Sequence, residues 1–158
     1  MEFTAKDKFF SMKRAYERLR RINTDNGNSI SNTDAKDAAE EFFNQCYHFK
    51  DWLKKDHSIS ITSNIEEFIT NSTSLSLAAD YCNSFKHGGL DKKARSNKQL
   101  EKINTHIKLD LTPGGFIATS RLEITINGIK YDAFSLATDC VDEWNKLLSK
   151  NNILFSNP

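Results

Sequence analysis

Apolar residues recur every three or four positions in five separate stretches of the chain, which is the spacing of one face of an α-helix. The predicted helices cover about residues 3–22, 35–55, 64–71, 75–87 and 133–149. The second illustrates the pattern, because Phe42, Cys46, Phe49 and Leu53 follow one another along a stripe that belongs against a core.

Between the fourth and fifth of these helices the apolar period changes from helical to alternating. Residues 103–111 alternate apolar and polar, as in a strand with one buried face, and Leu122, Ile124 and Ile126 alternate again. A short third strand is predicted at residues 129–131, so the meander covers residues 103–131. Turns are predicted at Pro-Gly-Gly, residues 113–115, and at Asn-Gly, residues 127–128. The predicted fold class is therefore mainly α: an up-and-down helical bundle with a small antiparallel β-meander inserted before the last helix.

Polar residues that can cap helices stand near the predicted helix starts. The candidates are Asn32 or Thr33 for the second helix, Ser63 with Glu66 at capping-box spacing for the third, Ser74 for the fourth, and Asp132 or Ser135 for the last. Gly88 and Gly89 are expected to end the fourth helix.

Length and composition favour a single domain over residues 1–158. The chain is 38% hydrophobic and contains 11 Phe, so it can bury a core without covalent staples. Cys46, Cys82 and Cys140 stand on predicted helices and are expected to be buried free thiols. There is no signal-peptide pattern and no apolar run near the ~18 residues of a membrane span, so a cytoplasmic protein without membrane contact is expected.

The formal net charge of +1 hides an uneven distribution of charge along the chain. Basic residues concentrate in the first helix and in the connector that follows the fourth. Arg14 and Arg18 in the helix, with Lys92, Lys93 and Arg95 in the connector, are candidate contacts for the phosphates of an RNA partner. An ordinary solvated helix face explains the basic side chains of the first helix equally well.

Familiar catalytic and cofactor motifs are absent from the sequence. There is no glycine-rich phosphate loop, no paired CxxC, no HExxH and no nucleophile elbow. The 4 histidines are scattered without the spacing of metal ligands, so neither a metal ion nor a cofactor is expected.

The segment that carries candidate chemistry is the end of the fourth helix. His87 stands on the final turn, Asn83 one turn earlier, and Lys86 supplies a cation beside the imidazole. These residues could perform general acid–base chemistry on a phosphodiester, with the lysine neutralising the developing charge. The structural alternative is that Lys86 and His87 only cap the last carbonyls of the helix.

Two helical segments, EEFFNQCYHFKDWLKKD and LSLAADYCNSFKHGGL, resemble the central helix pair of the HEPN superfamily. These small helical domains occur in bacterial toxins, anti-phage systems and RNA-processing enzymes. Their signature is an Arg, usually followed by a polar residue, with a His about four to six positions after the Arg. Active members are metal-independent endoribonucleases, usually with two protomers sharing one cleft. The resemblance implies His87 as the general acid or base, Asn83 as the polar residue, and a homodimer.

One position departs from the family signature. Cys82 stands five residues before His87, where the family carries its Arg, and a thiol cannot offer the charged planar fork of a guanidinium. Either Lys86 or Arg95 replaces that cation, or the domain is not catalytic. The meander at residues 103–131 is not part of the minimal family bundle and is interpreted as an insertion.

Two specific functions therefore stay open, beside the general one of a phage or mobile-element accessory protein of unknown role. The first is a HEPN-like RNA-binding domain with metal-independent endoribonuclease activity, of a toxin or antiviral-defence type. The second is a non-catalytic protein-interaction or dimerisation module from a mobile element or phage-defence locus, in which the His87 turn is structural. Trp52, near His48 and Asp51, is either a stacking platform for an RNA base or an edge of the core.

Overall fold

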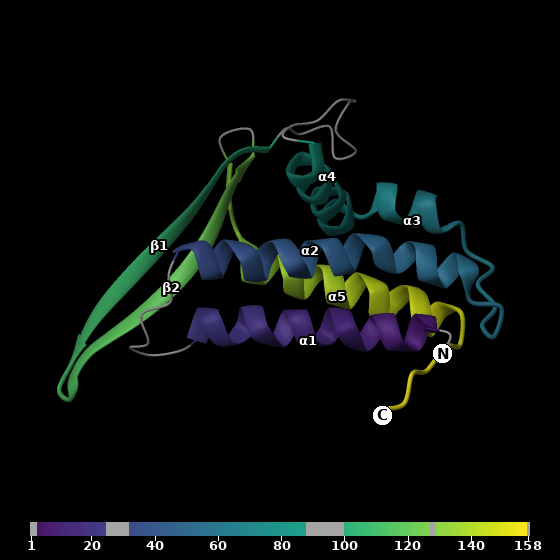
Figure 1. The fold of residues 1–158 in the computed structure, drawn as a ribbon, viewed down its shortest axis with the longest axis horizontal. Coiled ribbons are helices and arrows are strands. Elements are labelled where there is room, and N and C mark those ends of the chain that lie inside the picture. The colour runs from purple at the N-terminus through teal and green to yellow at the C-terminus, as the bar shows by residue number, and fades with distance from the viewer. Residues whose placement is uncertain (1–2, 25–31, 88–99, 127–128, 158) are drawn as a thin grey trace.

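The computed structural model describes residues 3–24, 32–87, 100–126 and 129–157 (Figure 1). In chain order the elements are α1 (Ala5–Thr24), α2 (Asn32–Lys55), α3 (Ile65–Asn71), α4 (Thr73–His87), β1 (Leu100–Thr112), β2 (Gly115–Ile126), β3 (Ile129–Asp132) and α5 (Ala133–Lys150). This order confirms the predicted fold class, a mainly helical bundle with a small antiparallel sheet before the last helix.

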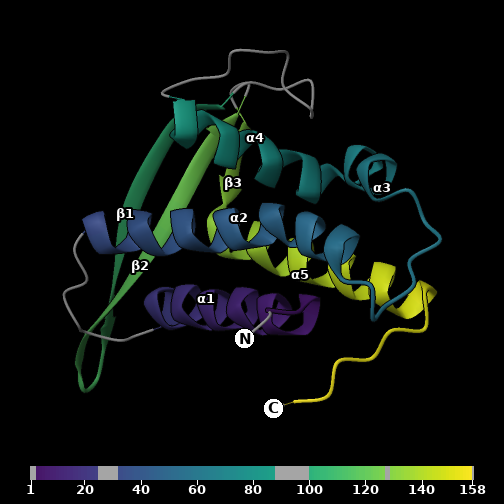
Figure 2. The ribbon, with the colours of Figure 1, turned by 45° about the vertical axis from the view of Figure 1, so that its right-hand side comes forward.

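The helices are arranged around a layer formed by α2 and α5. In both views α1 lies on one side of this layer and α4 on the other, and α3 continues beside α4 (Figures 1 and 2). The β1–β2 hairpin crosses the C-terminal end of α1 and the N-terminal end of α2 (Figure 1). The first and fourth helices are consequently separated by the middle of the bundle.

The core is filled by aromatic and aliphatic side chains from the predicted apolar stripes. Its largest fully buried members include Met12 of α1, Phe42, Phe43 and Phe49 of α2, Tyr81 of α4 and Trp144 of α5. All three cysteines are buried and free, as predicted. Burial raises the pKa of the Cys140 thiol, whose Sγ donates a hydrogen bond of 3.4 Å to the carbonyl of Ser74.

The sheet is three-stranded and antiparallel, in the order β1-β2-β3. Thr112 pairs with Gly115, so the first predicted turn is confirmed between these two positions. Ile126 pairs with Ile129 across the second, although Asn127 and Gly128 themselves lie outside the described residues. Leu122 and Ile124 of β2 are buried, and they attach the sheet to the core.

Of the predicted helix caps, the one for α5 is confirmed. The Asp132 carboxylate accepts a hydrogen bond of 2.9 Å from the Ser135 backbone N–H.

Three other cap predictions are wrong by a few residues, and a fourth cannot be compared. Helix α2 already begins at Asn32, so Asn32 and Thr33 lie inside it. Asn64 caps α3 in place of Ser63, and Ser72 caps α4 in place of Ser74, because the Ser72 hydroxyl accepts from the Leu75 N–H at 3.3 Å. Gly88 and Gly89, expected to end α4, lie outside the described residues.

Candidate functional site

Cys82, the residue that departs from the signature expected from the sequence resemblance, faces α2 from α4. Its thiol donates a hydrogen bond of 2.8 Å to Asn44 Oδ1, and its Sγ lies 4.0 Å from His48 Nε2. Only 2% of the residue is exposed. This position is therefore internal to the contact between the two helices that carry the family resemblance.

His48 is held by a carboxylate of its own helix. Its Nδ1 lies 3.3 Å from Asp51 Oδ2, three residues further along α2, while Nε2 faces α4. The His48 side chain is 48% exposed, so one edge of the ring reaches solvent. We call Asn44, His48 and Asp51 of α2, together with Cys82 and Asn83 of α4, the α2–α4 seam.

The order Cys82, His48, Asp51 resembles the arrangement of a thiol nucleophile with its base and its orienting carboxylate. The thiol, however, donates to Asn44 and is buried, whereas a reactive cysteine needs a partly exposed thiolate. We therefore assign Cys82 a packing role, in which its sulfur joins the two helices.

The sequence-predicted residues on α4 belong to the same helix pair. Asn83 is half-buried and follows Cys82 directly. Lys86 and His87 form part of the last turn of α4, but their side chains lie outside the described residues, as do Lys92, Lys93 and Arg95. Of these predicted site residues, Asn83 alone has a side chain that the structure describes, and it is the neighbour in sequence of Cys82, which contacts α2.

Arg14 and Arg18 are exposed on α1, on the far side of the α2–α5 layer from α4 (Figures 1 and 2). Arg18 forms an ion pair with Glu41 of α2, and Arg14 Nη2 donates to Ser11 Oγ at 3.0 Å. The structure therefore does not bring these two arginines together with Asn83.

Other charges on α1 are also paired. Arg20 and Arg21 both contact Glu17, and the hydrogen bond from Arg20 lowers the pKa of the Glu17 carboxyl. Part of the positive charge of this helix is thus balanced at its own surface, which weakens α1 as a phosphate-binding face.

Trp52, the candidate stacking residue, packs at an edge of the core. Its ring meets the Phe3 ring edge-on at 6.4 Å between centroids, and the Lys8 ammonium lies 4.9 Å from the indole centroid. Both contacts come from the N-terminal segment rather than from α4, so Trp52 is directed away from the seam. This geometry favours the structural interpretation of Trp52.

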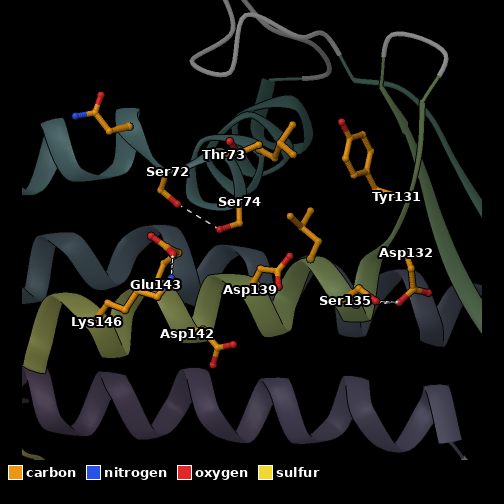
Figure 3. Close-up of a pocket in the computed structure, with 13 residues that line it drawn as sticks. Ser72, Thr73, Ser74, Tyr131, Asp132, Ser135, Asp139, Asp142, Glu143 and Lys146 are labelled. Carbon is orange, nitrogen blue, oxygen red and sulfur yellow. Dashed lines mark hydrogen bonds and ion pairs between the residues drawn. The ribbon is translucent and has the colours of Figure 1, made fainter.

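A pocket of about 440 Å³ lies where the α3–α4 junction meets β3 and α5 (Figure 3). Its acidic lining residues are Asp132, Asp139, Asp142 and Glu143. Lys146 also lines it, and its pKa is raised by an ion pair of 2.6 Å with Glu143. The excess of carboxylates disfavours a phosphate group here, so this pocket is distinct from an RNA site. Sequence reasoning did not single it out, because its residues come from separate segments.

Sequence reasoning also missed the partnership of Asn44 and His48 with Cys82. The sequence does carry a signal for one half of this contact, because Asn44, His48 and Asp51 recur at helical spacing and so share a face of α2. That spacing does not indicate which helix lies opposite.

Within the described ranges, no three His, Cys, Asp or Glu side chains gather closely enough to hold a metal ion. None of the described helices is both long and apolar enough to cross a membrane. Comparison with protein-family models, with curated proteins and with solved structures found no match to the chain.

Proposed function

We propose that the protein is a HEPN-like domain that binds RNA along the α2–α4 seam, acts as a homodimer, and has a role of toxin or antiviral-defence type. One observation carries this proposal: the two segments that resemble the family pack against each other, with Cys82 Sγ 4.0 Å from His48 Nε2. Half-exposed His48 and half-buried Asn83 offer hydrogen bonds to the phosphate and sugar oxygens of a strand laid along this helix pair.

The proposed chemistry at this site is metal-independent cleavage of RNA. The 2′-hydroxyl of the RNA attacks the adjacent phosphate, and His87 gives or takes a proton. Lys86 and Asn83 hold the phosphate and balance its developing charge. Lys92, Lys93 and Arg95 extend the phosphate contacts beyond the end of α4.

Binding of labelled RNA tests the proposal directly. We expect the wild-type protein to bind single-stranded RNA with an affinity that falls as salt rises, because phosphate contacts release counterions. His87→Ala, tested beside it in EDTA, should retain binding and lose cleavage. His57→Ala is the matched control, since His57 is exposed in the segment after α2 and lies outside the seam. Absence of RNA binding by the wild-type protein would contradict the proposal.

The burial of Cys82 favours a second candidate, a non-catalytic interaction or dimerisation module. Cys82 is neutral and buried, whereas the family signature has a cation at this position. The two helices can therefore pack together without forming a catalytic site. Light scattering coupled to size-exclusion chromatography separates the candidates when combined with the RNA assay. A dimer that neither binds nor cleaves RNA supports the second.

A further inference from the structure

We propose that the pocket between the α3–α4 junction, β3 and α5, here called the acidic pocket, binds a small organic polycation that also carries neutral oxygen atoms, as an amino sugar does. Its volume of about 440 Å³ is that of a small-molecule site. The seam residues Cys82 and Asn83 stand further along α4 than Leu77, the last residue of that helix in the described lining. The proposal is therefore independent of RNA binding at the α2–α4 seam.

Carboxylates dominate the charge of the acidic pocket. Its charged lining residues are Asp132, Asp139, Asp142, Glu143 and Lys146, so four negative groups and one positive group leave a formal charge of −3. Lys146 Nζ contacts Glu143 Oε1 at 2.6 Å. Within the described part of the chain, the exposed side chains of Asp139 and Asp142 form no hydrogen bond or ion pair. The acidic pocket can therefore attract ammonium groups.

These carboxylates are spread along the pocket rather than gathered at one point. Asp139 follows Asp132 by seven residues and Glu143 follows Asp139 by four, which corresponds to about 10 and 6 Å along the axis of α5. In agreement with this spread, no three His, Cys, Asp or Glu side chains of the described residues lie close enough to hold a metal ion. A ligand with several amines can meet these charges together, whereas a single metal ion cannot.

A second observation, independent of the charges, concerns two buried serines that line the pocket. Ser72 and Ser74 are only 7% and 9% exposed. Their Oγ atoms are 3.2 Å apart (Figure 3), and Ser72 Oγ also accepts a hydrogen bond of 3.3 Å from the Leu75 N–H. The pair has two hydroxyl hydrogens but only one bond between its oxygens. Among the described residues, one of these hydrogens therefore has no acceptor.

This hydrogen selects the second property of the ligand. A buried hydroxyl needs a hydrogen-bond partner, and the excess of carboxylates repels an anionic acceptor. A neutral oxygen, such as a hydroxyl or ether oxygen, satisfies both conditions. A fully protonated polyamine carries no such acceptor.

Apolar surface completes the acidic pocket. The buried side chains of Leu77 and Leu136 line it, and Tyr131 lines it from β3 (Figure 3). Such surfaces cover the carbon skeleton of an organic ligand, and an aromatic face also attracts ammonium groups. Several amines, neutral oxygens and a compact carbon skeleton together describe an amino sugar that carries more than one amine.

Isothermal titration calorimetry of the RNA-free, full-length protein with kanamycin, an amino sugar with several amines, tests the proposal. We expect binding that weakens as salt rises. Asp139→Asn and Asp142→Asn should each weaken it about 2- to 5-fold. Lys146→Met removes the competing ammonium and should strengthen it by a similar factor. Asp37→Asn is the matched control, because Asp37 is exposed on α2 and does not line the pocket, so this variant should bind like wild type.

Two comparison ligands separate the amines from the oxygens. Spermidine has amines but no oxygen, and methyl glucoside has oxygens but no amine, so we expect both to bind more weakly than kanamycin. A double variant, Ser72→Ala with Ser74→Ala, removes both hydroxyls. It should weaken kanamycin about 3- to 10-fold and leave spermidine nearly unchanged. Circular dichroism checks that its helices are retained, and the exposed Asp139 and Asp142 variants decide the result if they are not.

Wild-type protein that does not bind kanamycin overturns the proposal, and so does a loss in Asp37→Asn equal to that in Asp139→Asn. Spermidine that binds as tightly as kanamycin overturns the assignment of a neutral oxygen. None of these assays uses RNA, so their failure leaves the proposed function intact. Absence of RNA binding likewise leaves this inference intact.

Discussion

Trp144 of α5 donates a hydrogen bond of 3.1 Å from its indole Nε1 to the backbone carbonyl of Cys46 on α2. The indole is fully buried and meets the Phe49 ring edge-on at 5.2 Å between centroids. One side chain therefore joins the two middle helices by a polar bond and by ring packing. A buried Trp needs such a partner for its N–H, and here the partner fixes the relative position of α2 and α5.

Replacement of this residue should destabilise the bundle strongly. Trp144→Phe removes the N–H donor and leaves a cavity, so we expect a loss of about 2–4 kcal/mol in the free energy of unfolding. Urea denaturation measures it. Trp52→Phe is the control, because Trp52 is only half-buried at the edge of the core and should lose less than about 1.5 kcal/mol. Equal losses for the two variants would contradict the assigned role of Trp144.

Acid should weaken the link between α2 and the start of α1. The Asp56 carboxylate accepts hydrogen bonds from Ser58 and from the Ala5 N–H, and these bonds lower its pKa from the ordinary value of 3.8. A lowered folded-state pKa gives stability that is present above 3.8 and lost as the pH falls through the folded-state value.

The variant Asp56→Asn isolates this effect. We expect it to be less stable than wild type at pH 7 by under about 1 kcal/mol, because the group is largely solvated. The difference should shrink toward pH 2. Denaturation midpoints across this range provide the measurement, and a difference that grows on acidification would contradict the sign.

The start of α5 depends on the side chain of Asp132. Its carboxylate accepts from the N–H and the hydroxyl of Ser135 at 2.9 and 3.0 Å. Asp132→Ala should cost about 1 kcal/mol in thermal or urea unfolding, as for other N-cap losses. Asp132→Asn keeps an oxygen acceptor and should recover most of the loss; no difference between the two variants would argue against capping.

An arginine at position 82 should not be tolerated. Cys82→Arg places a guanidinium between α2 and α4, and we expect a loss of more than about 3 kcal/mol in the free energy of unfolding. Cys82→Ala removes the sulfur and its donation to Asn44, at a cost of about 1–2 kcal/mol. An arginine variant as stable as wild type would show that this position can turn outward.

Local sequence signals predicted most of the fold, since apolar period and turn residues act within a few positions. The failed prediction at the start of α3 shows where such signals stop. Ser63 and Asn64 can both cap a helix, but the Ser63 hydroxyl accepts a hydrogen bond of 3.2 Å from Asn151 Nδ2, 88 residues away. Asn64 is left to cap the Glu67 N–H. A contact with Asn151, which is distant in sequence, therefore decides which residue caps α3.

The candidate site shows the same limit. His48 and Trp52 lie one turn apart on α2, yet they contact different neighbours. His48 faces Cys82 of α4, and Trp52 packs on Phe3 before α1. Helical spacing predicts that both residues lie on one helix, but it does not predict which other elements pack against each of them. The contact between α2 and α4 comes from tertiary packing, so the residues of the α2–α4 seam could be identified only from the structure.

The place of α5 in chain order has a consequence for biosynthesis. This helix contacts α1, α2 and α4, and its Cys140, Trp144 and Leu147 are fully buried among them. The ribosome nevertheless makes it after all three. While residues 1–132 emerge, the apolar stripes of the earlier helices lack the partner that they surround, and nascent chains with exposed apolar surface are prone to aggregate. Completion of the bundle must await the last helix, so a chain stopped before residue 133 should depend on chaperones to remain dispersed.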